Sequence, residues 1–101
     1  MAKTSVVNRN KRRIKIVSRH ADKRSDLKAK IYDKTISIEE RYGYVLQLAK
    51  LPKDGSRTRV RNRCSISGRP RGVYKKFMLA RSMLRDFASR GLIPGVIKSS
   101  W

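Results

Sequence analysis

The chain has 101 residues, with 27 Lys and Arg against 7 Asp and Glu, so its formal net charge at pH 7 is +20. A chain of this size holds one small domain with a modest core, and self-repulsion makes the compact state marginal unless a polyanion neutralises it. A membrane span, a secretory signal and an internal disulfide are all disfavoured, because no apolar run approaches roughly 20 residues, the basic opening lacks an apolar stretch, and Cys64 is the only cysteine.

The first predicted element is a basic helix within residues 5–31, a stretch without Pro or Gly. The apolar positions along it are Ile14, Val17, Ala21, Leu27 and Ile31. A gap of six residues interrupts their three- and four-residue spacing and predicts an irregularity near residue 24. Like charges four residues apart, such as Lys11 and Lys15, oppose the helix, so we expect a partner to stabilise it.

A second helix is predicted over residues 38–50. Ser37 suits the N-cap and Glu40 follows three residues later, which is the pattern of a capping box, and Pro52 stops the helix. Its apolar face consists of Ile38, Tyr42, Val45 and Ala49. We expect this face to pack against the first helix.

Residues 55–76 lose helical periodicity and predict an irregular, partly extended segment. Within it, four arginines alternate strictly: Arg57, Arg59, Arg61 and Arg63. In an extended chain, alternate side chains project from one face about 6.6 Å apart, a step similar to that between phosphates along one strand. Arginine also binds phosphate through two parallel hydrogen bonds and stacks on bases. The alternative is a solvated, disordered charge run, which the interspersed apolar residues disfavour.

The hexamer SGRPRG, residues 67–72, predicts a turn that lets the backbone approach a nucleic acid while it presents Arg69 and Arg71. Tyr74 follows, beside Lys75 and Lys76, and this mixture of aromatic and basic residues suits stacking on unpaired bases. The alternative role is to anchor a small core, which we favour for Phe77.

A third, short helix is predicted over residues 79–90, with Arg81 and Arg85 on its polar face. Gly91 lies where a left-handed C-terminal cap belongs, and Leu92 can close the cap. The tail that follows is too short for an element of its own.

The distribution of charge favours a nucleic-acid partner. Residues 1–30 hold eleven Lys and Arg against two Asp, and residues 52–101 hold thirteen against two, whereas residues 31–51 are balanced. We expect a basic helical arm with a helical hairpin over residues 1–51, and an arginine-rich RNA-binding segment with a short helix and a tail over residues 52–101, in one structural unit. The scattered carboxylates form no catalytic constellation, so we expect no enzyme. A free-standing DNA-binding or nucleoid protein and a subunit of an RNA-modifying enzyme are the alternatives.

Four motifs and the closing residues carry a family resemblance: RNRC at 61–64, SGRPRG at 67–72, LAR at 79–81 and GLIPG at 91–95, then Lys98, Ser100 and Trp101. With these, the C-terminal half resembles the family of the fourteenth ribosomal protein of the small subunit, in the longer bacterial form that lacks zinc. The first fifty residues resemble the family in their basic opening and helical character and much less in residue identity. Met78 departs from the family pattern, which commonly has a glycine there.

The elements and the resemblance together predict a mainly helical, extended fold with two or three helices, an irregular arginine-rich segment resembling a zinc-less ribbon, and a small core. The resemblance implies a structural component of the head of the small ribosomal subunit that binds 16S rRNA, is needed for assembly and supports the RNA near the A site. Its implied neighbours are the third, tenth and nineteenth proteins of that subunit, with no membrane and no small-molecule substrate. It implies cytoplasmic ribosomes or those of an organelle.

In short members of the family, four cysteines hold zinc at the positions of Cys64, Ser67, Ala80 and Met83. A structural zinc site needs four good donors and only one thiol is left here, so we predict no metal and no other cofactor. The side chains expected to contact RNA are Arg12, Arg13, Arg57, Arg59, Arg61, Arg63, Arg69, Arg71, Tyr74, Lys75, Lys76, Arg81, Arg85, Lys98 and Trp101.

Overall fold

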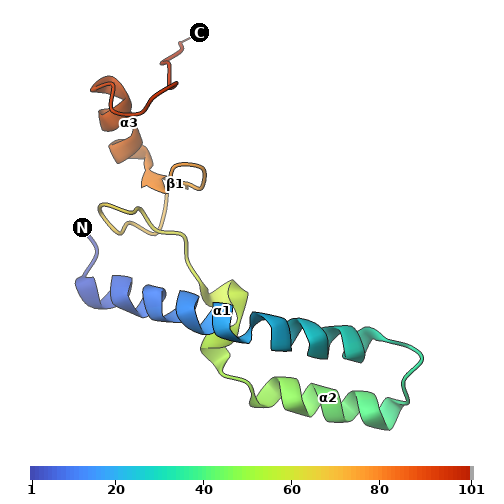
Figure 1. The fold of residues 1–101 in the computed structure, drawn as a ribbon. Helices are drawn as coiled ribbons and strands as arrows, with labels where there is room; N and C mark the ends of the chain where they lie inside the picture. The colour runs from blue at the N-terminus through green and yellow to red at the C-terminus, as the bar shows by residue number, and fades with distance from the viewer. Residues whose placement is uncertain (101) are drawn as a thin grey trace. The chain divides into compact units, whose positions relative to one another are not determined.

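The computed structural model of the chain describes residues 1–100 and is mainly helical (Figure 1). Its elements are α1 (Thr4–Tyr32), α2 (Ile38–Lys50), the 3₁₀ turns η1 (Lys53–Gly55) and η2 (Arg57–Arg59), β1 (Val73–Tyr74), β2 (Leu79–Ala80) and α3 (Arg81–Ser89). The predicted mainly helical class with a small core is confirmed. The chain forms two compact units: residues 8–60 make up the helical unit, and residues 1–7 together with residues 61–100 make up the C-terminal unit.

Helix α1 is continuous over 29 residues, so the predicted irregularity near residue 24 is wrong. The covered stripe of the helix between residues 13 and 31 consists of Arg13, Ile16, Val17, His20, Arg24, Leu27 and Ile31. These positions recur every three to four residues without a gap, as one face of a straight helix requires. Arg24 fills the gap in the apolar pattern, because an arginine can bury its aliphatic stem and keep its charged end in water.

Helix α2 begins and ends where predicted. The Ser37 side chain caps it by accepting a hydrogen bond from the Glu40 amide at 3.4 Å, and Pro52 lies two residues beyond its end. In the loop before the helix, Asp33 accepts hydrogen bonds from the backbone and the side chain of Thr35 at 3.0 and 2.8 Å. These bonds lower the pKa of the Asp33 carboxyl and brace the loop.

The face of α2 that meets α1 is not the predicted one. Tyr44 is half-buried, and the Lys30 Nζ of α1 lies 5.3 Å from the centre of its ring. Ile38, Tyr42 and Val45 remain exposed, with exposed fractions of 75%, 63% and 42%. The expected packing of these residues on the first helix is therefore wrong, because the Tyr44 face takes that place. We call Ile38, Tyr42 and Val45 the uncovered α2 face.

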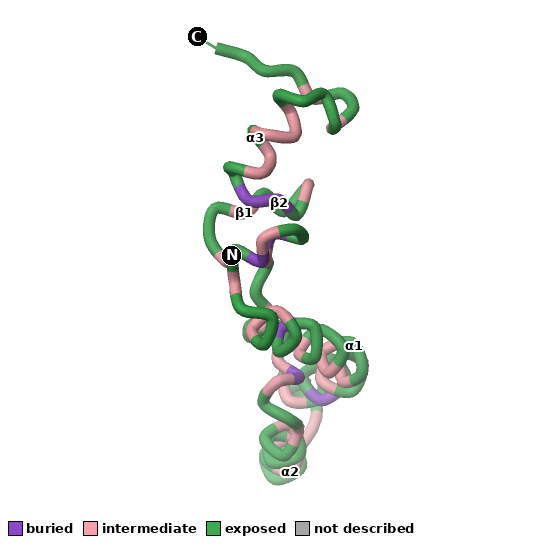
Figure 2. The backbone as a smooth tube through the Cα atoms, turned by 90° about the vertical axis from the view of Figure 1, so that its left-hand side faces the viewer, coloured by how far each residue is buried: buried purple, intermediate pink, exposed green. Residues whose placement is uncertain are grey.

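The core of the C-terminal unit lies where β2 leads into α3 (Figure 2). Its buried residues are Cys64, Leu79 and Ala80, and around them pack Val73, Phe77, Met83, Leu84, Phe87 and Ile93. Strands β1 and β2 pair in antiparallel fashion, with Val73 opposite Ala80 and Tyr74 opposite Leu79. The role in the core that we favoured for Phe77 is confirmed.

Helix α3 ends in the predicted glycine cap. Gly91 has a φ of 70°, its amide donates to the Ala88 carbonyl at 3.2 Å, and the Leu92 amide donates to the Phe87 carbonyl at 3.0 Å. The two bonds satisfy carbonyls at the end of the helix, and glycine adopts the positive φ without strain. The helix starts two residues later than predicted, since β2 takes the residues before it.

The first residues of the chain belong to the C-terminal unit. The Ala2 amide donates a hydrogen bond to the Ser67 carbonyl at 3.1 Å. Gly68 is buried with a φ of 74°, and a Cβ at this position would lie 2.9 Å from Cγ2 of Val7. Both the backbone conformation and the close approach of the N-terminal segment therefore require a glycine here.

Candidate nucleic-acid interface

The alternating arginines do not form one extended series. The first two, Arg57 and Arg59, lie in the 3₁₀ turn η2, where the Val60 amide donates to the Arg57 carbonyl at 3.3 Å. Side chains of a 3₁₀ turn point in different directions, with three residues per turn. The expectation that all four arginines project from one face of an extended strand is therefore wrong.

Asp54 forms ion pairs with two of the candidate arginines in the helical unit. Its Oδ1 lies 3.3 Å from the Arg13 Nε and 3.5 Å from the Arg59 Nη1. Exposed ion pairs of this kind contribute about 0.2–1 kcal/mol each. Arg13 is half-buried whereas its neighbour Arg12 is exposed, so Arg13 connects α1 to the 3₁₀ turns and Arg12 faces solvent.

The loop over residues 61–72 is held together by its own arginines. Arg61 Nε and Arg63 Nη1 donate hydrogen bonds of 2.9 Å to the carbonyls of Pro70 and Gly68. These bonds join the start of the loop to its end. The exposed side chains of the SGRPRG turn are Arg69 and Arg71.

The turn between β1 and β2 carries Lys75 and Lys76, both exposed. The Lys76 Nζ lies 5.8 Å from the centre of the Phe77 ring. Met78 closes the turn: its φ is 53° and its amide donates to the Tyr74 carbonyl at 2.7 Å. A positive φ favours glycine, the residue that the family resemblance implies at this position.

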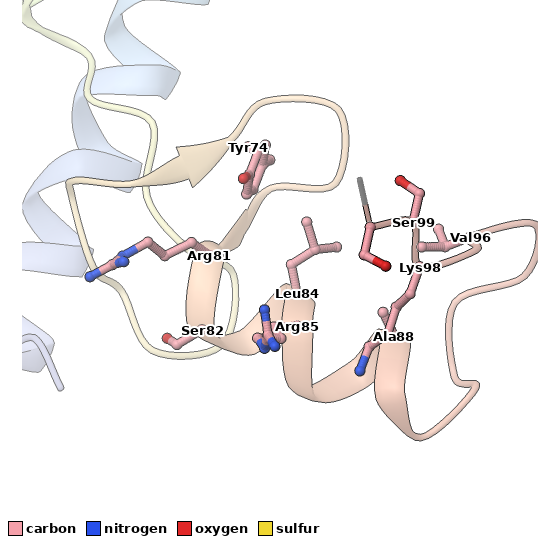
Figure 3. Close-up of a pocket in the computed structure, with 10 residues that line it drawn as sticks. Tyr74, Arg81, Ser82, Leu84, Arg85, Ala88, Val96, Lys98 and Ser99 are labelled. Atoms are coloured by element: carbon pink, nitrogen blue, oxygen red, sulfur yellow. The ribbon is translucent and has the colours of Figure 1, made fainter.

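A groove of about 850 Å³ runs along α3, between the β1–β2 hairpin and residues 96–100 (Figure 3). We call it the α3 groove. Four of the candidate RNA-binding residues line it: Tyr74, Arg81, Arg85 and Lys98. Leu84 and Ala88 supply apolar surface between the cations, and none of the described lining residues is acidic. The structure thus gathers residues from the hairpin, the helix and the tail around one cationic cavity.

A smaller groove of about 330 Å³ in the helical unit contains two cations that are not among the predicted RNA-binding residues. Arg24 and Lys28 of α1 line it together with Arg57. The two α1 residues are four positions apart and therefore lie on one face of the helix. This spacing was the available signal, but only the fold shows that Arg57 lies beside them.

The four positions that the family resemblance associates with zinc, Cys64, Ser67, Ala80 and Met83, converge in this structure. The Ser67 amide lies 3.5 Å from the Cys64 Sγ, Ala80 is buried with Cys64, and Met83 packs against the same cluster. Burial raises the pKa of the Cys64 thiol, but hydrogen bonds from the side chain and backbone of Ser67 help to lower it to about 7. A thiol, a hydroxyl, a methyl group and a thioether are not the donor set of a tetrahedral zinc site, so these residues do not fit the metal.

The positive charge of the C-terminal unit is almost uncompensated. Its sequence holds eleven Lys and Arg and a single carboxylate, Asp86, which lies 3.3 Å from the Arg90 Nε. Within residues 1–100, no group of three or more His, Cys, Asp and Glu side chains could hold a metal ion. In the same range, no helix combines the length and the apolar character needed to cross a membrane. Trp101, the remaining candidate, lies outside the described residues.

Comparison with known proteins gives a family for this cationic chain. Residues 47–100 match the family model of ribosomal protein S14p/S29e. The chain is 54% identical to small ribosomal subunit protein uS14 of Brucella anthropi, 56% to that of Rhodospirillum rubrum and 52% to that of Rickettsia typhi, each over 101 residues that span both chains completely. The chain therefore belongs to the ribosomal protein S14p/S29e family, as a long member with a single cysteine, and is a non-enzymatic structural constituent of the small ribosomal subunit.

Proposed function

We propose that the protein binds 16S rRNA in the head of the small subunit, that assembly of the subunit needs it, and that it supports the RNA near the A site. The observation that carries the proposal is the charge of the C-terminal unit, where eleven cations face a single carboxylate. Contact between cations and phosphates supplies affinity that does not depend on base sequence, and the shape of the folded RNA supplies specificity. The assembly and A-site roles follow from the family resemblance.

The candidate cations divide into two groups by what else they do. Exposed cations make up the first group: Arg12, Arg57, Arg69, Arg71, Lys75, Lys76, Arg81, Arg85 and Lys98. The second group also binds its own chain and consists of Arg13, Arg59, Arg61 and Arg63. A guanidinium has five N–H donors, so an arginine with one internal bond keeps donors for a phosphate. In this proposal Arg61 and Arg63 shape the loop over residues 61–72, and Arg13 and Arg59 connect α1 to the 3₁₀ turns through Asp54. All four also contact the RNA, as do Tyr74 and Trp101.

The uncovered α2 face favours contact with neighbouring proteins in addition to contact with RNA. Ile38, Tyr42 and Val45 expose apolar surface, and Glu39 and Glu40 beside them would repel phosphate. We propose that this face meets one of the neighbouring small-subunit proteins, the third, tenth or nineteenth. Membership of a ribosomal family favours this assembly over a free-standing DNA-binding protein. The arm over residues 1–51 and the segment over residues 52–101 would act there as one structural unit, in cytoplasmic or organellar ribosomes.

The proposal is tested by the salt dependence of binding to 16S rRNA. Replacing Arg69, Arg71 and Lys76 together by Gln should reduce the slope of log K against log salt by about 0.7–0.9 for each phosphate that the variant no longer neutralises. Arg90→Gln is the matched control, since Arg90 is already paired with Asp86 and should contribute little to the slope. An unchanged slope in the triple variant would show that these cations do not bind phosphate.

A further inference from the structure

We propose that the α3 groove binds one unpaired nucleotide of the RNA, with its base stacked on Tyr74 and its phosphate held by cations of α3 and the tail. The inference rests on the proposed function and adds a definite chemistry to it. Phosphate contacts alone require only a polyanion. Binding in the groove, in contrast, requires an unpaired base that is extruded from its RNA helix.

Tyr74 provides the stacking surface. Its residue is 53% exposed, while its backbone is fixed by pairing with the buried Leu79 in the hairpin. Phe77, the other aromatic residue of this turn region, packs against the core and is not available to a base. Stacking of one base on an aromatic side chain strengthens binding roughly fivefold to a hundredfold, and a rigid platform loses little entropy when it does so.

The walls of the groove provide the charge for a phosphate. Arg85 of α3 lines the groove from the helix and Lys98 reaches toward the helix from the tail, whereas the Arg81 side chain lies at the edge of the groove against Gly72 and points away from Lys98 (Figure 3). Helix α3 has no acidic residue in its first turn, so the positive end of its dipole adds to the positive electrostatic potential of the groove. Asp86 is on the same helix but pairs with Arg90 and does not line the groove.

The size and lining of the groove suit a nucleotide and exclude a duplex. A volume of about 850 Å³ falls within the range of roughly 300–1,000 Å³ that is typical of clefts for single small ligands. Leu84 and Ala88 offer apolar surface for the base or the sugar, and the hydroxyls of Ser82 and Ser99 can bond polar edges. Proteins read RNA sequence mostly through such extruded bases, because the major groove of an RNA helix is too narrow for side chains.

The test compares the full-length protein on two RNA hairpins that differ only in whether one 2-aminopurine is bulged or paired with an opposite uridine. The wild-type protein should bind the bulged hairpin roughly fivefold to a hundredfold more tightly and quench its fluorescence by stacking. Tyr74→Leu should lose both the preference and the quenching. Tyr74→Phe should keep both, because it retains the ring.

Two further variants separate the groove from the rest of the surface. Lys98→Gln should weaken binding of the bulged hairpin more than binding of the paired hairpin. Lys76 does not line the groove, so Lys76→Gln should weaken binding of both hairpins equally. If the wild-type protein binds both hairpins alike with a steep salt dependence, rRNA binding stands and the groove inference is wrong. The inference is equally wrong if Tyr74→Leu retains the preference. Failure to bind either hairpin would overturn the proposed function itself.

Discussion

Met78 occupies a left-handed backbone conformation, with a φ of 53°, at the end of the β1–β2 turn. An L-residue in this conformation is destabilised by about 1–2 kcal/mol. The residue is 39% exposed, so its side chain has limited contacts that could compensate for the strain. Hydrogen bonds nevertheless stabilise the turn, because the Met78 carbonyl also accepts one of 2.8 Å from the Ser65 amide.

We therefore expect Met78→Gly to stabilise the free protein by about 0.5–1 kcal/mol, since relief of the strain exceeds the added entropy of a glycine in the unfolded chain. Met78→Ala is the control, because it removes the side chain and leaves the strain. Thermal denaturation followed by circular dichroism measures the difference. Lower stability of the glycine variant would show that the Met78 side chain packs more usefully than its exposure indicates.

The roles of single residues were predictable from the sequence only where the signal is local. Ser37 and Gly91 act within one helical turn of their own positions, and both caps are found where predicted. The internal bonds of Arg61 and Arg63 depend on how residues 61–72 fold back on themselves, and no spacing reveals that. Charge alone identifies a cationic residue without showing whether its guanidinium is turned toward its own chain.

At the level of elements, the sequence predicts helix bounds better than helix faces. The apolar residues of α2 lie on two sides of the helix, and periodicity cannot tell which side meets α1. The structure places Tyr44 against α1 and leaves Ile38, Tyr42 and Val45 exposed. The 3₁₀ turn η2 was missed for a related reason, because alternation of arginine and other residues resembles a strand until Asp54 is seen to bind Arg59.

Replacing Tyr42 and Val45 together by Ser should leave the stability of the isolated protein within about 0.5 kcal/mol, because both are exposed. The same variant should be incorporated less efficiently into reconstituted small subunits, measured by cosedimentation. Leu48→Ser is the control, since Leu48 is half-buried and its loss should lower stability itself, by roughly 1 kcal/mol. Normal incorporation of the double variant would rule out this face as a contact surface.

For the molecule as a whole, charge and core size act against each other. Among the described residues the buried hydrophobic ones are Leu27, Cys64, Leu79 and Ala80, whereas the net charge is +20. So small a core stabilises the fold little, and self-repulsion opposes it. Composition alone predicted this balance, because it depends on totals rather than on the position of any residue.

The isolated chain should therefore show less helix by circular dichroism than α1, α2 and α3 together require. Helix content should rise when 16S rRNA is added, because a polyanion that binds the folded form shifts the equilibrium toward it. An uncharged crowding polymer at the same mass concentration is the control and should change the spectrum little. Full helix content in the absence of RNA would contradict the expected balance of charge and core.

The hydrogen bond between Ala2 and Ser67 has a consequence for biosynthesis. Residues 1–7 are synthesised before residues 8–60, yet the part of the chain that they join is synthesised after residue 60. At roughly 5–20 residues per second, about 3 to 12 seconds separate the two, and residues 8–60 can fold in the interval. Until then residues 1–7 lack the Ser67 carbonyl to which the Ala2 amide donates.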